Sequence, residues 1–174
     1  KALINVGEPA QAYKLLWALY IHNPYDAELK LDIATAALNQ GKPEVAYQHL
    51  LSMPMEAAHA DAAKLLLLRS LIQLGDVVEA RKLIQEFTPG LNGDGTLIQL
   101  EANLLQKEGR LEEAAWLLSE LCRKEPRITQ HRIQLSIILS ALRRQQGAIL
   151  MLKQTVLLEP NKFENKSLLL RLLL

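Results

Sequence analysis

The sequence has little of several residue types, and each shortage excludes a class of protein. One of the 174 residues is a cysteine, and 5% are aromatic. The single cysteine, Cys122, cannot form an internal disulfide or a multi-thiolate metal site. Eight glycines and seven prolines, with no short glycine period, exclude collagen-like and low-complexity chains.

Long apolar runs are also missing. The longest are residues 65–68 and residues 168–174, the latter interrupted by Arg171, and a membrane-spanning helix needs about 20 apolar residues. The chain starts at Lys1 without a signal-peptide pattern, so we expect a fragment or a processed piece of a longer protein. The sequence does not give the compartment: a lone thiol favours the cytoplasm, and a periplasmic or membrane-tethered location stays open.

What the chain does have is aliphatic residues and an uneven distribution of charge. Hydrophobic residues make up 49% of it, which excludes a disordered chain and predicts a real core. Residues 1–122 hold 10 basic and 16 acidic side chains, whereas residues 123–174 hold 10 basic and 3 acidic ones. An acidic partner, head-to-tail self-association or nucleic acid could use this dipole. Nucleic acid is disfavoured because Phe163 is the only aromatic residue in the basic part.

A period of 34 residues runs through the chain. The glycines that carry it are Gly7, Gly41, Gly75 and Gly109. Five residues after each, and once more a period later, come Ala12, Ala46, Ala80, Ala114 and Ala148. Four residues beyond the alanines stand Leu16, Leu50, Ile84, Leu118 and Leu152, and Pro24, Pro126 and Pro160 follow in a third register. Such a period predicts a repeat architecture.

We predict a pair of helices in each repeat because the apolar residues recur at helical spacing. The glycine ends the first helix in the left-handed conformation that a C-cap favours. Pro9 and Pro43 fit the first turn of the second helix, and Asp76 with Glu79 predicts a capping box. The recurring alanine is small because the two helices of a pair cross closely at that point.

This pattern resembles the tetratricopeptide repeat, whose 34-residue helix-turn-helix unit carries a glycine, an alanine, a bulky residue and a proline at these places. The resemblance implies an all-α, right-handed solenoid of helix pairs, a superhelix that extends over residues 1–174 as a single repeat domain. The expected repeats are 27–60, 61–94, 95–128 and 129–162, with partial repeats at 1–26 and 163–174. Departures from the pattern include Glu101 at an aliphatic place and Arg143 at the fifth glycine. The early tryptophan place holds instead Lys30, Lys64, Ile98, Arg132 and Lys166.

Residues able to carry chemistry form no recognisable catalytic or metal-binding motif. The four histidines, His22, His49, His59 and His131, make no zinc-binding set. Cys122 falls on the packed side of a second helix, where a small apolar side chain suits. The glycine-rich residues 90–95 lie in a loop between repeats, where turn residues are expected and local mobility follows. We therefore predict a non-enzymatic chain that binds neither cofactor nor metal.

The resemblance also implies a concave groove lined by the first helices of the repeats, where partner peptides lie. Its lining positions fall, in this sequence, on Leu31, Thr35, Leu38, Leu65, Arg69, Ile72, Gln99, Asn103, Gln106, Ile133 and Ile137. Some family members clamp acidic chaperone tails with lysine, asparagine and arginine. Those places here hold Leu31, Thr35, Leu66, Thr96 and Leu100, or Leu65, Arg69, Leu100, Gln130 and Gln134. An apolar or amphipathic segment, held centrally by amides, is the expected ligand. The alternative is that Leu31, Leu65 and Ile133 only pack between helices.

The function expected from these features is a protein–protein interaction scaffold or chaperone-like adaptor that supports a larger complex. Two alternatives stay open. The chain could be a self-associating assembly element, driven by apolar ends and opposed charges. It could also be a regulatory arm of an enzyme, or of a secretion or biogenesis machine, encoded outside these residues.

Overall fold

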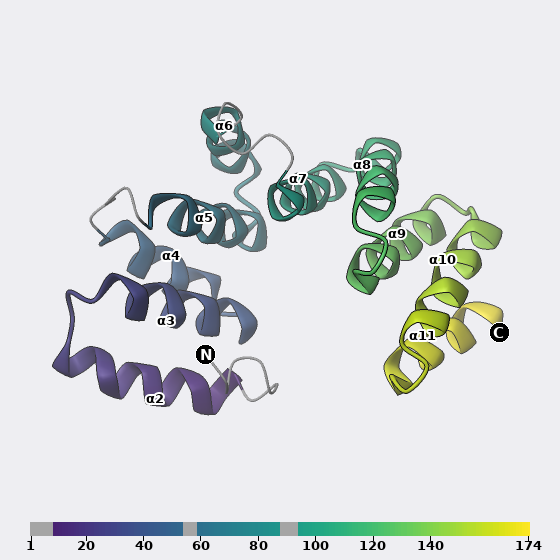
Figure 1. The fold of residues 1–174 in the computed structure, drawn as a ribbon. Helices are drawn as coiled ribbons and strands as arrows, with labels where there is room; N and C mark the ends of the chain where they lie inside the picture. Colours follow the sequence, from purple (N-terminus) through teal and green to yellow (C-terminus); the bar gives the residue numbers. More distant parts are fainter. Residues whose placement is uncertain (1–8, 54–58, 88–93) are drawn as a thin grey trace. The chain divides into compact units, whose positions relative to one another are not determined.

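Helices joined by short turns make up the residues that the structure, a computed structural model, describes: 9–53, 59–87 and 94–174. The helices of these ranges follow one another in the order α2 (Pro9–His22), α3 (Ala27–Asn39), α4 (Pro43–Leu51), α5 (Ala60–Leu74), α6 (Val77–Phe87), α7 (Gly95–Lys107), α8 (Leu111–Lys124), α9 (Thr129–Ala141), α10 (Gln145–Leu158) and α11 (Phe163–Leu173) (Figure 1). The predicted all-α class is confirmed. None of the helices in these ranges is long and apolar enough to cross a membrane.

The helices belong to two compact halves, an N-terminal half of residues 1–87 and a C-terminal half of residues 88–174. Within each half every helix packs against the next one in sequence, and α3 also packs against α5. A first helix thus contacts its own second helix and the second helix of the preceding repeat, which is the sequential pairing expected of a repeat protein. The single domain over residues 1–174 stays a prediction.

The turn inside each helix pair is closed in the same way. Gly41, Gly75 and Gly109 have φ angles of 70°, 82° and 77°, and Arg143 takes the same left-handed conformation with φ 59°. After each of these residues, the next backbone N–H donates to a carbonyl five residues earlier, as Arg110 does to Leu105 at 2.9 Å and Arg144 to Leu139 at 2.8 Å. The predicted C-caps are therefore confirmed at these positions. The glycine of the first repeat, Gly7, lies outside the described residues.

Helix starts follow the predicted signals. Pro9 and Pro43 open α2 and α4, where a missing N–H costs nothing. Asp76 Oδ1 accepts a hydrogen bond from the Glu79 backbone N–H at 3.2 Å, which confirms Asp76 as a cap. Asp26 and Asp94 cap α3 and α7 in the same manner. These caps satisfy amides that a helix cannot pair internally.

The core of each half is built from the recurring small and aliphatic residues. Ala46, Ala80, Ala114 and Ala148 are all fully buried. The aliphatic residues four positions later, Leu50, Ile84, Leu118 and Leu152, are buried as well. Each buried leucine or isoleucine contributes roughly 1.5–3 kcal/mol. The 34-residue register therefore places the same core contact in successive helix pairs. Most glycines of the predicted loop 90–95 lie outside the described residues, so its mobility stays a prediction.

Candidate functional site

The groove residues predicted in the N-terminal half come from α3 and α5, and they differ in how much surface they offer. Leu31 and Leu65 are half-buried, and Leu31 packs against the core of this half. Leu38 and Ile72 are only 2% and 5% exposed, so their side chains belong to the core. They offer no surface to a ligand, and we do not retain them as anchors.

Two polar groove residues of the N-terminal half are engaged within the protein. The Thr35 hydroxyl donates to the Leu31 carbonyl at 2.8 Å. Arg69 Nη2 donates to Asn39 Oδ1 at 2.9 Å, which ties α5 to α3. Burial lowers the pKa of the Arg69 guanidinium from its usual value, yet an arginine stays charged in proteins. This side chain therefore keeps a positive charge, with donors besides the one given to Asn39.

The amide groups predicted at the centre of the groove, in the C-terminal half, are mostly used between repeats. Gln99 Oε1 lies 2.8 Å from His131 Nδ1, and Asn103 Oδ1 accepts from Gln134 Nε2 at 3.4 Å. Both interactions join α7 to α9. Gln106 is exposed at the end of α7. Gln106 is thus the exposed one of the three predicted amides, and the role of all three toward a ligand backbone stays a prediction.

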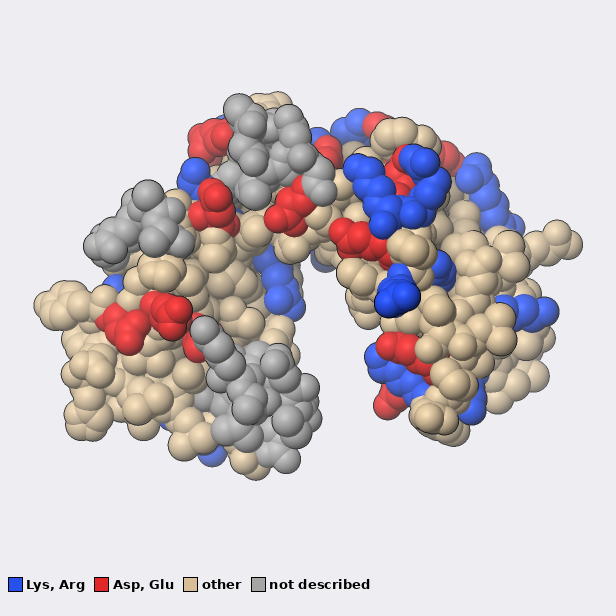
Figure 2. All heavy atoms as spheres, viewed as in Figure 1, with Lys and Arg blue, Asp and Glu red and all other residues tan. Residues whose placement is uncertain are grey.

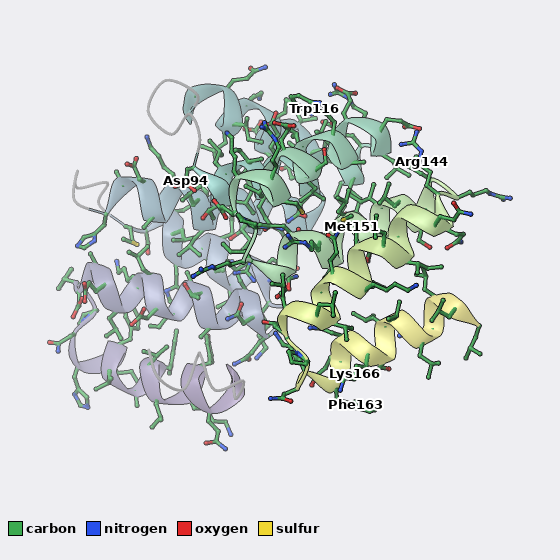
Figure 3. All side chains as sticks on the ribbon, turned by 45° about the vertical axis from the view of Figure 1, so that its right-hand side comes forward. Asp94, Trp116, Arg144, Met151, Phe163 and Lys166 are labelled. Atoms are coloured by element: carbon green, nitrogen blue, oxygen red, sulfur yellow. The ribbon has the colours of Figure 1, made fainter. Side chains whose placement is uncertain are left out.

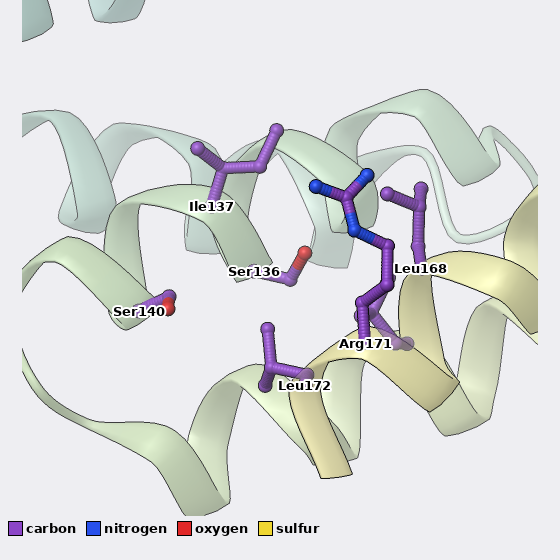
Figure 4. A pocket seen from close by; sticks show the side chains of 7 residues that line it. Ser136, Ile137, Ser140, Leu168, Arg171 and Leu172 are labelled. Carbon is purple, nitrogen blue, oxygen red and sulfur yellow. The ribbon is translucent and has the colours of Figure 1, made fainter. Parts of the chain in front are cut away.

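A pocket of about 280 Å³ lies where α9, α10 and α11 meet, and one predicted groove residue lines it. Its lining residues are Ser136, Ile137, Ser140, Leu152, Leu168, Arg171 and Leu172. Ile137 is 50% exposed, whereas Ile133, one helical turn earlier on α9, is half-buried. Figure 4 shows the Arg171 side chain extending from α11 toward α9, with Ile137 on the other side of the pocket. Arg171 stands 34 residues after Ile137, at the same place of the repeat.

The electrostatics of this pocket are set by an excess of basic side chains. Residues 129–173 contain seven basic residues and two acidic ones, Glu159 and Glu164. Lys162 Nζ forms an ion pair with Glu159 Oε2 at 3.2 Å. No side chain of the described ranges pairs with Arg171. Basic side chains are prominent over α8 to α11 in Figure 2. An apolar pocket beside an unpaired guanidinium can bind an aliphatic side chain next to a carboxylate.

The structure also groups aromatic residues that sequence reasoning passed over. Tyr13, Trp17 and Tyr20 share one side of α2, and Trp17 and Tyr20 each meet the His49 ring edge-on at a centroid distance of 5.4 Å. Lys42 Nζ lies 5.3 Å from the Tyr13 ring centroid. The spacing of four and three residues along one helix was the available signal. Burial, and then the charge of Lys30, lower the pKa of His49 from 6.5.

Cys122 is the remaining candidate for chemistry among the residues that the sequence singles out. Cys122 is half-buried on α8 against the core of the C-terminal half. Burial raises the pKa of its thiol from 9.0, and the positive charge of Arg132 only partly opposes this. A protonated thiol is a poor nucleophile. Across residues 9–53, 59–87 and 94–174, no three His, Cys, Asp or Glu side chains gather in a way that could hold a metal ion.

Comparison with known proteins identifies the fold. No protein-family model matches the sequence, and no curated protein is significantly similar to it. Among solved structures, TTC0263, a thermophilic TPR protein of Thermus thermophilus, is 14% identical and superposes with a TM-score of 0.87 over 99% of this chain and 94% of its own. The MamA RS-1 ArsTM double mutant is 14% identical, with a TM-score of 0.60 over 91% of this chain and 89% of its own. YrrB, a TPR protein with an unusual peptide-binding site, is 15% identical, with a TM-score of 0.59 over 95% of this chain and 86% of its own.

Proposed function

We propose that this chain, which has the tetratricopeptide-repeat fold, is a non-catalytic scaffold that binds a segment of a partner protein. Proteins of this fold are typically interaction modules, and YrrB carries a peptide-binding site. The observation that carries the proposal is the pocket between α9 and α11. This pocket is mostly apolar, and Ile137 exposes half of its side chain there. The guanidinium of Arg171 lines the pocket, and no side chain of the described residues pairs with it.

The bound segment is amphipathic in this proposal. One aliphatic side chain enters between Ile137 and Leu168, and a neighbouring Asp or Glu of the segment pairs with Arg171. Since the Ser136 hydroxyl already donates to the Ile133 carbonyl at 2.6 Å, it serves the ligand as an acceptor. The Ser140 hydroxyl is not engaged within the described ranges. The pair of contacts therefore selects an apolar residue and an acid close together in the sequence of the partner.

The energy of such binding comes from a few anchors on a preformed surface. Each aliphatic side chain that leaves water contributes roughly 1.5–3 kcal/mol, before the cost of ordering the segment. Micromolar affinity corresponds to about −8 kcal/mol, which a few anchors and one charge-assisted pair can reach. The scaffold itself changes little, because its helices are already packed in sequential pairs.

The test uses a synthetic peptide array screened with the whole chain, followed by fluorescence polarisation of the peptides that bind. We expect enriched peptides to carry Leu or Ile near Asp or Glu. The variant Ile137→Lys should abolish their binding, and Arg171→Glu should shift the preference from acidic to basic neighbours. Lys153→Glu, an equal charge change on α10 outside the pocket lining, is the matched control. Unchanged affinity in both Ile137→Lys and Arg171→Glu would reject this pocket as the binding site.

A further inference from the structure

An exposed tryptophan on α8 interrupts a repeat position that is otherwise polar in the N-terminal half. Trp116 is 64% exposed. At the same place of the three earlier repeats stand Lys14, Gln48 and Lys82, all exposed, as an outward position on a second helix requires. At the same place of the following repeat Leu150 is 52% exposed, so both full repeats of the C-terminal half present a large apolar side chain at this position. Exposed tryptophans are typical anchors of protein interfaces.

A hollow of about 430 Å³ lies directly beside this tryptophan. It is lined by Glu112, Ala115, Trp116, Ser119, Leu135, Leu139 and Arg144. Leu135 is buried and Leu139 half-buried, so α9 contributes an apolar floor. Trp116 comes from α8 and Arg144 immediately precedes α10 (Figure 3). The hollow therefore involves α8, α9 and the start of α10, and it shares no lining residue with the pocket around Arg171.

Two opposite charges line the hollow without neutralising each other. Glu112 and Arg144 both contribute to its wall, and neither side chain forms an ion pair or hydrogen bond within residues 9–53, 59–87 and 94–174. A partner surface of one sign would satisfy one of these charges and repel the other. A second copy of the same patch, turned by a two-fold axis, offers a carboxylate to the arginine and a guanidinium to the glutamate.

We infer that this face is a self-association surface, through which two copies of the chain form a two-fold dimer. Trp116 of each copy enters the hollow of the other and packs on Leu135 and Leu139. Glu112 of each copy pairs with Arg144 of the other copy. An isologous contact of this kind uses one patch twice, so the tryptophan and both charges are satisfied together. The pocket around Arg171 stays free for the partner segment, and the two surfaces act independently.

The first test is sedimentation velocity of the whole chain from low to high micromolar concentration. We expect the mass to rise from monomer to dimer. The variant Trp116→Ser should weaken dimerisation by at least about tenfold. Leu157→Ser, which also removes an exposed apolar side chain but lies outside the hollow, should leave it unchanged. Circular dichroism verifies that each variant is folded. An unaltered chain that stays monomeric throughout, or a dimer that persists in Trp116→Ser, overturns the inference.

The second test exchanges the two charges. Glu112→Arg and Arg144→Glu should each weaken the dimer, because each places like charges opposite one another. An equal mixture of the two variants should restore a dimer, since every pair across the axis is then opposite in sign. Failure of the mixture to dimerise better than its components overturns the inference. Peptide binding by Trp116→Ser, and dimerisation by Arg171→Glu, should both match the unaltered chain, so either proposal can fail alone.

Discussion

Glu125 and His131 are joined across the turn between α8 and α9, with Glu125 Oε2 and His131 Nε2 2.9 Å apart. The same contact recurs one repeat later, where Asn165 Nδ2 donates to Glu159 Oε2 at 2.9 Å. His131 and Asn165 are 5% and 1% exposed. In the earlier repeats their place holds buried apolar residues, Leu29, Ala63 and Leu97. The last two junctions between repeats are therefore built on polar contacts where the earlier ones use apolar packing.

This polar junction predicts a non-additive pair of substitutions. Glu159→Ala should lower the urea midpoint of unfolding, because it leaves the buried amide of Asn165 without its acceptor. Asn165→Leu, which restores the apolar residue of the earlier repeats, should be much less harmful. In the double variant, the loss caused by Glu159→Ala should largely disappear. Equilibrium urea unfolding of the four proteins measures this coupling.

Additive losses in this cycle would contradict the assigned hydrogen bond. The same bond explains why the pKa of Glu159 lies below 4.5: the Asn165 amide, more than Lys162 or Thr129, stabilises the charged carboxylate. Glu86→Ala is a suitable control, since that glutamate is exposed on α6 and lies outside both proposed surfaces.

The histidine of the aromatic cluster predicts a loss of stability on mild acidification. Since burial lowers the pKa of His49 below 6.5, the unfolded chain binds a proton more readily than the folded one as the pH falls through 6.5. Stability should thus decrease from pH 6.5 down to the folded-state pKa of His49. Urea midpoints between about pH 7.5 and 5.5 should fall less in His49→Gln than in the unaltered chain. His22→Gln, at an exposed histidine, should keep the full decline, and an equal decline in all three proteins would exclude His49 as its source.

The helices, their order and their caps could be predicted from the sequence because the 34-residue period fixes them locally. The burial of individual side chains could not be predicted from the sequence. A repeat position indicates which way a side chain faces but not how closely the next helix covers it. For this reason the sequence predicts Leu38 and Ile72 in the groove, whereas their side chains are buried in the core. The hydrogen bond between Gln99 and His131 could not be predicted either, because it depends on which side chain the neighbouring repeat places beside Gln99. Arg171 lines a pocket because residues of α9, α10 and α11 come together there, and the repeat pattern alone does not give that placement.

The alanine register predicts that a larger side chain at a helix crossing is poorly tolerated. Ala80 is fully buried where α6 packs against α5. Ala80→Leu should cost about 1–3 kcal/mol in the free energy of unfolding, because a close-packed crossing has no room for extra methyl groups. Lys107→Ala, at an exposed position, should change stability by less than about 0.5 kcal/mol. Urea unfolding monitored by circular dichroism compares the two, and an unchanged midpoint in Ala80→Leu would mean that the register is wrong.

Gly109 and Arg143 are 34 residues apart, at the same place of the repeat, and both have the left-handed backbone conformation. In this conformation a residue with a side chain raises the free energy of the folded state by roughly 1–2 kcal/mol, and glycine avoids that strain. Glycine also gives the unfolded chain more conformational freedom, which offsets part of the gain. Arg143→Gly should therefore stabilise the chain modestly, by about 0.5–1 kcal/mol. Gly109→Arg should destabilise it by about 1–2 kcal/mol through backbone strain alone, since an added Cβ at Gly109 would meet no atom within 4 Å.

Urea unfolding of these two variants decides how the fifth turn is stabilised. Opposite signs of the two changes would show that Arg143 is a strained substitute for the repeat's glycine, held in place by the helices on either side. A destabilising Arg143→Gly would instead mean that the arginine side chain offsets the strain of its own backbone. In that case the departure from the repeat pattern at residue 143 contributes to the stability of the α9–α10 pair.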